Sequence, residues 1–316
     1  MKSVILLNRI ETGINEALIR LRAGDRRGLV ALFELSLENS SEKAEKVARH
    51  DRARGAIEEI YLAGIRKTLA RARSQVLHKL HRGSQSLLTS SPAGARYVRM
   101  NRPVALHNAG HPAAADFMFD LDDFTKMFFA EMREAGEEGL EISGQGLLSE
   151  LGIDRKYVTP HGLIHDFVVD RENKLSQVPA EIWDTVKSAL EDGVKEGMST
   201  NQLADRIVEE TFGKIDKGRA FTVARTETSA VYNTGRMDAM RQHGITHKKW
   251  LTAHDERVRK SHADAEGDGA IPIGQKFSNG LMQPGDPSGA AADVINCRCT
   301  LEAAEPPGGG ATKGES

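Results

Sequence analysis

The sequence predicts an α+β protein, mainly helical in its N-terminal part, in which three further helices lead into a small lobe of short strands and loops. Three observations support this. Apolar residues recur three or four positions apart over much of the chain, as they do on one face of a helix. Turn-forming Pro and Gly, together with a short alternation of apolar and polar residues, gather after residue 250. Aromatic residues make up 5% of the chain and its mean hydropathy is −0.43, which is typical of a soluble, helix-rich polypeptide.

Length and composition shifts predict four parts. The 316 residues exceed the length of a usual single domain. We expect a basic helical part over residues 1–115, with a linker rich in Ser, Gly and Pro near 83–95. An acidic helical segment rich in Phe and Met follows over residues 116–177. The helices and lobe occupy residues 178–303, and a disordered tail residues 304–316. No apolar run is long enough to predict a membrane span.

The N-terminal part is basic. Residues 1–82 hold 17 Lys or Arg against 10 Asp or Glu, although the net charge of the chain is only −2. The periodicity predicts helices over residues 18–37 and 57–80, and the polar side of the second carries cations suited to DNA phosphates or an acidic protein surface. We favour a solvated helix face, because no aromatic residues interleave with the cations. The candidate contact residues are Arg66, Lys67, Arg71, Arg73, Lys79 and Arg82.

The next segment reverses the charge. Residues 116–150 hold 10 Asp or Glu against two basic residues. Its Phe and Met residues predict a helix that faces the core, with a partner-binding stripe as the alternative. Farther on, His161 and His165 have the four-residue spacing of metal ligands on a helix. Pro160 and Gly162 argue against a helix there, so we expect a loop that leads to a strand over residues 167–169.

Three helices are predicted before the lobe. Pro179 suits the first turn of the first helix, because its missing N–H costs little there. Ser199 and Gln202 form the capping-box pattern that begins the second helix. After a break over residues 213–218, the third helix is expected over residues 219–243, with Gly244 as its stop.

The lobe contains both cysteines of the chain. Residues 294–301 alternate as a strand, which would place Cys297 and Cys299 on one face. With His262 and His254 they offer the thiolate and imidazole ligands that Zn²⁺ prefers. The alternative is that both thiols pack as small, reduced core residues, since a disulfide between residues two apart would be strained.

Several blocks of this region together carry a family resemblance. In order they are Ala224-Arg225-Thr226-Glu227, Asn233, Gly235, Trp250, Asp255-x-Arg257-Val258-Arg259-x-x-His262, Phe277, Pro284-Gly285-Asp286-Pro287 and Asn296-Cys297-Arg298-Cys299. Over residues 178–301 the chain resembles the Mu F-like, or head-morphogenesis, family of phage minor head proteins. The resemblance implies a tailed-phage or prophage protein that associates with the portal vertex and is packaged in few copies.

The remaining functional expectations follow from that resemblance and from missing motifs. Partners would be the portal protein, a scaffold or major capsid protein and double-stranded DNA, with no membrane partner. The protein would pass from the host cytoplasm during assembly into the virion head. No phosphate loop, serine elbow, dinucleotide fingerprint or metalloprotease motif occurs, so we predict no enzyme. The alternative is a metal-dependent hydrolase or toxin-like transferase built on the His and Cys residues of the lobe.

Overall fold

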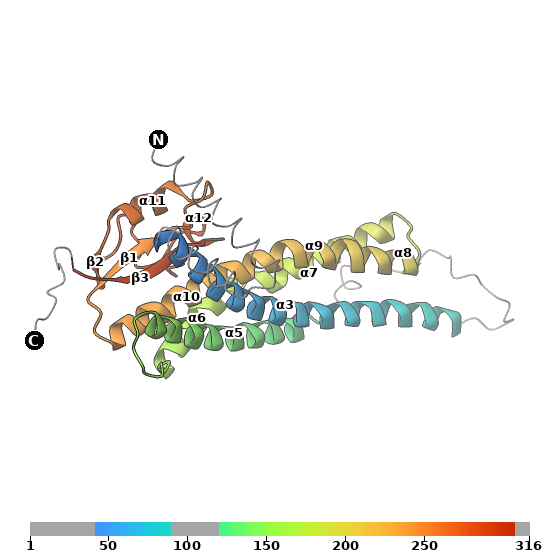
Figure 1. The fold of residues 1–316 in the computed structure, drawn as a ribbon. Coiled ribbons are helices and arrows are strands. Elements are labelled where there is room, and N and C mark those ends of the chain that lie inside the picture. Colours follow the sequence, from blue (N-terminus) through green and yellow to red (C-terminus); the bar gives the residue numbers. More distant parts are fainter. Residues whose placement is uncertain (1–41, 90–119, 307–316) are drawn as a thin grey trace, which may run out of the picture. The chain divides into compact units, whose positions relative to one another are not determined.

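The computed structural model describes residues 42–89 and 120–306. Contacts divide the chain into two compact units, Met1–Ala53 and Arg54–Ser316. Only the beginning of helix α3 (Glu42–Thr89) belongs to the described part of the first unit, so the fold below is that of the second. The predicted helix over residues 18–37 and the last ten residues of the predicted tail lie outside the described residues. The predicted class is confirmed, because helices dominate and one small sheet lies near the C-terminus (Figure 1).

Helix α5 (Leu121–Glu150) and helix α10 (Phe221–Gln242) form the centre of the helical part, and α3 packs against α5. The side chain of Asp120 caps α5 by accepting a hydrogen bond from the Asp123 N–H at 2.9 Å. The Phe and Met stripe of α5 faces the core, as one reading of the sequence predicts. Its buried members are Phe124, Phe128 and Met132.

Helix α6 (His161–Leu175) occupies the segment for which a loop and a short strand are predicted, so that prediction is wrong. Pro160 lies at the N-cap, where its carbonyl accepts from the Ile164 N–H at 3.1 Å and the helix needs no N–H from it, so the proline does not interrupt the helix. Within the helix Phe167, Arg171 and Leu175 are buried at four-residue spacing. The longer helical period therefore outweighs the local signal of Pro and Gly.

The next helices follow the sequence closely, except at one predicted break. Helix α7 (Val178–Lys195) begins beside Pro179, and the capping box of Ser199 and Gln202 starts α8 (Thr200–Asp205) as predicted. The chain then stays helical through η1 (Arg206–Phe212), α9 (Gly213–Ile215) and η2 (Asp216–Ala220) into α10. The π-helical turns of η1 and η2 change the winding, so that apolar residues on both sides of the glycines remain buried.

Two predicted boundaries at glycines have different outcomes. Gly244 has φ +67°, which confirms it as the stop after α10. The predicted linker near residues 83–95 is wrong for its first part, because α3 continues to Thr89. Residues 90–95 lie outside the described range. The Ser and Gly residues at the start of this segment therefore do not end α3, because extending an existing helix is much easier than starting one.

The lobe contains a three-stranded antiparallel sheet in the order β2-β1-β3, with α11 (Lys260–Gly267) and α12 (Ala291–Val294) beside it (Figure 1). The strands are β1 (His247–Leu251), β2 (Ile271–Pro272) and β3 (Thr300–Ala304), and Trp250 pairs with Leu301. The strand predicted over residues 294–301 is wrong for most of its length. Val294 ends α12, and Asn296 has φ +56°, which turns the chain before β3 begins.

Close backbone approaches explain two glycines of the resemblance. A Cβ atom on Gly235 would lie 2.0 Å from Ser143 Oγ, so α10 can approach α5 this closely only without a side chain there. Gly285 has φ +71°, and a Cβ atom would lie 2.8 Å from the backbone nitrogen of Ala230. The Pro-Gly-Asp-Pro loop is thus seated directly on the backbone of α10. Among the described helices, none has the length and apolar character needed to span a membrane.

Candidate metal centre

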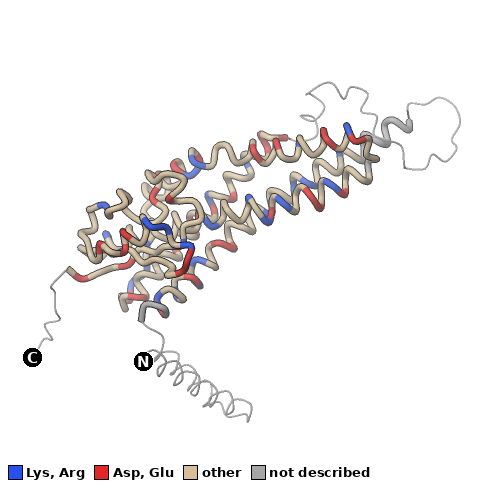
Figure 2. The backbone as a smooth tube through the Cα atoms, turned by 90° about the horizontal axis from the view of Figure 1, so that it is seen from above, with Lys and Arg blue, Asp and Glu red and all other residues tan. Residues whose placement is uncertain are grey.

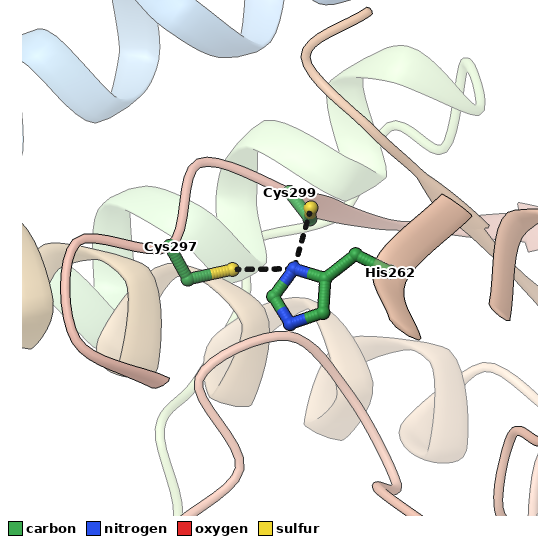
Figure 3. Close-up of side chains that lie close together, drawn as sticks. All are labelled: His262, Cys297 and Cys299. Atoms are coloured by element: carbon green, nitrogen blue, oxygen red, sulfur yellow. Dashed lines mark hydrogen bonds between the residues drawn. The ribbon is translucent and has the colours of Figure 1, made fainter. Parts of the chain in front are cut away.

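His262, Cys297 and Cys299 meet in the interior of the lobe (Figure 3). The imidazole comes from α11, and the two thiols come from the segment between α12 and β3. His262 Nδ1 lies 3.8 Å from Cys297 Sγ and 3.4 Å from Cys299 Sγ. All three side chains are buried, each with at most 3% of its surface exposed. The prediction that both thiols point the same way therefore holds, although most of the predicted strand does not form.

The ligand spacing suits a tetrahedral metal ion. The three candidate ligand atoms lie within 4.8 Å of one another. Zn–S and Zn–N bonds of about 2.3 and 2.0 Å at tetrahedral angles separate sulfur and nitrogen ligands by roughly 3.5 Å. The two measured separations of 3.8 and 3.4 Å bracket that value. These residues therefore fit zinc as three ligands, with a fourth position left for a water or another ligand.

The two thiols differ in acidity because they share one hydrogen bond. Donation by Cys299 holds the pKa of Cys297 well below its usual range, and His262 lowers it further against the opposing effect of burial. The same bond and burial raise the pKa of Cys299. Thiolate is the form of cysteine that ligates a metal, and the lowered pKa favours this form at Cys297.

Packing orients the imidazole. The ring of Trp250 lies 5.2 Å from that of His262 between centroids, and Trp250 makes an edge contact with Phe277 at the same distance. His262 Nε2 is buried, and no atom of the described residues forms a hydrogen bond with it. The ring position therefore depends on its apolar neighbours and on Nδ1.

Side chains of the helices hold the backbone that carries the thiols. Asn233 Nδ2 donates to the carbonyl of Cys299 at 3.3 Å, and its Oδ1 accepts from the N–H of Leu301 at 2.7 Å. Arg236 Nε donates to the carbonyl of Leu301 at 2.7 Å, while its guanidinium also binds Glu150. Arg54 donates to the carbonyl of Arg298. The C-x-C segment is thus clamped to α10 and α3 through its main chain.

His254, the fourth predicted ligand, does not join the three. Its Nε2 lies 3.1 Å from Glu266 Oε1, and its Nδ1 lies 3.2 Å from Thr252 Oγ1. It has φ +53° in the loop after β1, and 35% of its side chain is exposed. Within the described residues the metal-type cluster therefore consists of three side chains.

The Arg and Glu of the first family-like block bind different neighbours. Arg225 lies 3.3 Å from Glu58 on α3. Glu227 is buried and forms two hydrogen bonds with Arg171 of α6, at 2.8 and 2.9 Å. Burial raises the pKa of Glu227, and the Arg171 guanidinium opposes that rise. These two positions join α10 to α3 and α6.

The remaining predicted family positions order the loops of the lobe. Arg298 binds Asp255 through two nitrogens, at 2.5 and 2.7 Å, and the bond lowers the pKa of Asp255. Arg259 donates to the carbonyls of Asp293 and Ile295, at 3.3 and 2.6 Å. Asp286, between Pro284-Gly285 and Pro287, accepts hydrogen bonds from the main chain of Met282 and Ser288. Arg257 is exposed beside Asp255, and Asn296 donates its N–H to Thr226.

The cations predicted on the second N-terminal helix are largely engaged within the chain. Arg66 pairs with Asp216 at 2.8 Å, Lys67 with Glu131 and Arg71 with Asp123 at 3.1 Å. Figure 2 shows Lys and Arg positions accompanied by Asp and Glu positions along the long helices. Lys79 also has an interaction within the chain, and Arg73 is exposed. Arg82 lies in α3, but its side chain is outside the described set.

Sequence reasoning missed the buried arginines. Arg171 occupies a core-facing position of α6 that is otherwise apolar, and Arg236 lies three residues after Asn233 on α10. A charged residue in a buried helical stripe predicts an oppositely charged side chain next to it in the fold, because an unpaired buried charge is strongly unfavourable. Their partners, Glu227 and Glu150, lie 56 and 86 residues away.

Comparisons with known proteins agree with the resemblance and its location. Residues 184–302 match the family described as Phage Mu protein F like protein. The matched range begins in α7, continues through α10 and contains the whole cluster of His262, Cys297 and Cys299. Neither the curated proteins nor the solved structures gave a match.

Proposed function

We propose that this chain, whose residues 184–302 match the Phage Mu protein F like family, is a minor head protein that acts in phage head morphogenesis. The family match is the observation that carries the proposal. In the finer form of the proposal, the protein binds the portal vertex, contacts scaffold or major capsid protein and is packaged in few copies. It acts in the host cytoplasm during assembly and then resides in the virion head, with DNA as a further contact.

Quantitative mass spectrometry of purified procapsids and mature particles tests this proposal. The particles come from the phage or induced prophage that encodes the chain, and copy number is measured against the portal protein. A few copies in both particle types support a minor head protein, and cross-links to the portal protein support its location. Presence in procapsids alone indicates an assembly factor that leaves. Absence from both particle types would overturn the proposal.

We further propose that His262, Cys297 and Cys299 hold a structural Zn²⁺ ion. The sheet beside them is small, with two residues in β2 and five each in β1 and β3, so it provides little backbone pairing of its own. A bound metal would add stability to such a small lobe. Three protein ligands and a free fourth position resemble a catalytic zinc site. All three ligands are buried, however, and a hydrolase or transferase needs substrate access to the metal, so burial favours the structural role.

Metal analysis of the purified full chain tests the zinc proposal. We expect about one zinc per chain by elemental mass spectrometry, and a lower thermal midpoint after chelation because metal binding stabilises the folded state. Cys299→Ser should lose the metal, whereas His254→Gln, which changes a histidine outside the cluster, should keep it. Equal zinc content in both variants, or none in the wild-type chain, would contradict the proposal.

A further inference from the structure

Five cationic residues from distant parts of the chain line one open cavity of about 440 Å³. Lys217 comes from η2, and Arg225 from the first turns of α10. Arg257 and Arg259 precede α11, and Arg298 precedes β3. The lining also contains Gly218, Phe221, Thr222 and Asn296, but no carboxylate. Four of the five cations are arginines, and all four belong to the family-like blocks.

Contacts within the chain hold three of the arginines in place. Arg259 is fixed by two backbone carbonyls and Arg298 by the carboxylate of Asp255. Arg225 stacks over the Phe221 ring at 4.5 Å from its centroid, and its bonds to Glu58 are long, at 3.3 and 3.4 Å. Groups held in this way need little reorganisation to meet a ligand. Lys217 and Arg257 are exposed and complete the rim.

The cationic side chains that line the cavity outnumber the carboxylates that bind them. Asp255 and Glu58 balance two of the five cations, which leaves a net positive cavity. Arginine presents a planar fork of N–H donors that matches phosphate oxygens, and phosphate offers more charge and more acceptors than one carboxylate. The Thr222 hydroxyl and the Asn296 side chain add neutral polar groups. The volume falls in the range of about 300–1,000 Å³ that is usual for small-molecule sites.

We propose that this cavity binds phosphate groups, carried either by a nucleotide or by a nucleic-acid backbone. The proposal goes beyond the role in head morphogenesis and does not depend on whether the chain is found in phage particles. The cavity is a different surface from the basic face of α3, whose cations pair with carboxylates of the same chain.

Binding to the full chain should be measured with three probes, namely inorganic phosphate, AMP and a short DNA duplex. We expect at least one probe to bind, and Lys217→Gln/Arg257→Gln to weaken that binding at least tenfold. For the duplex, the slope of log affinity against log salt should shrink by about 2, since two phosphate contacts are removed. The matched control, Lys260→Gln/Lys276→Gln, removes two exposed charges from outside the cavity and should bind as the wild-type chain does.

The probes distinguish the two phosphate sources. Binding of AMP and phosphate indicates a nucleotide site, whereas binding of the duplex alone indicates a nucleic-acid backbone, and both support the proposal. Equal losses in the cavity variant and the control would overturn it, because general surface charge would then explain the binding. It is also overturned if none of the three probes binds. Circular dichroism of both variants confirms that they fold.

Discussion

The helical part and the C-terminal lobe are stabilised in different ways. In the helical part, long helices bury apolar side chains such as Ile57, Phe128 and Val231, and a buried ion pair joins α6 to α10. In the lobe the strands are short, and polar side chains of α10 bind the main chain of β3 directly. The difference shows that a small sheet can depend on its supporting helix for hydrogen bonds as well as for apolar contact.

The buried ion pair of the helical part should give the largest effect. Glu227→Ala leaves the buried Arg171 guanidinium with only the longer contact to Asp170 at 3.3 Å, so we expect a loss of about 3 kcal/mol in unfolding free energy, the lower end for a broken buried ion pair. Urea unfolding followed by circular dichroism measures it. The double change Arg171→Met/Glu227→Leu removes both charges and should be close to wild type. If the single change lowers the unfolding free energy by less than the double change does, the ion pair does not hold α6 to α10.

The clamp on β3 should give an intermediate effect centred on the lobe. Asn233→Ala leaves the buried N–H of Leu301 without its acceptor, for which we expect a cost of about 1–3 kcal/mol. Thr234→Ser alters the adjacent, partly buried residue but keeps the hydroxyl that accepts from Gln283, so it serves as a milder control. Hydrogen exchange should show faster exchange in residues 297–304 than in α5. Uniform acceleration through both parts would mean that the lobe and helices are not separately stabilised.

The buried lysine of β1 should give the smallest effect. Burial lowers the pKa of Lys248 to about 8, and its ammonium group donates to the Met282 carbonyl. The folded state therefore binds fewer protons than the unfolded state between about pH 8 and the unfolded value of 10.5, so this residue makes stability rise with pH there. Below pH 8 both states are protonated and the cost of burying the charge is present in full.

The difference between wild type and Lys248→Met isolates that contribution. We expect the unfolding free energy of the wild type to rise by about 1 kcal/mol relative to that of Lys248→Met as pH rises through this window, which is less than the full pKa shift implies because part of the lysine environment is polar. Chemical unfolding at pH 7.5, 9 and 10.5 measures this relative rise. A constant difference across the three values would show that Lys248 does not change its protonation there.

Local signals in the sequence predicted the elements whose causes are local. The capping box at Ser199, the stop at Gly244 and the core-facing stripe of α5 depend on neighbours within a few residues, and each forms. The convergence of His262 with the C-x-C pair followed from a family-like set of blocks rather than from periodicity. The strand predicted over residues 294–301 failed because alternation alone does not reveal the left-handed turn at Asn296.

Long-range charge pairing was the part that the sequence could not provide. The cations of α3 look like an exposed basic row, but acidic residues of α5 and η2 lie opposite Arg66, Lys67 and Arg71 in the fold. The arginines that line the cationic cavity are dispersed over more than 70 residues of sequence and meet only when α10 packs beside the segments that precede α11 and β3. Regional charge alone could not show these pairings, because it carries no information on which charges meet.

The position of β3 at the outside of the sheet has a consequence for assembly at high protein concentration. An open strand edge can recruit a strand from a neighbouring molecule and begin aggregation. At Leu301 the outward N–H and carbonyl are already bound by Asn233 and Arg236. Side chains of α10 thus take the place of a fourth strand at this position, which restricts self-association through the sheet.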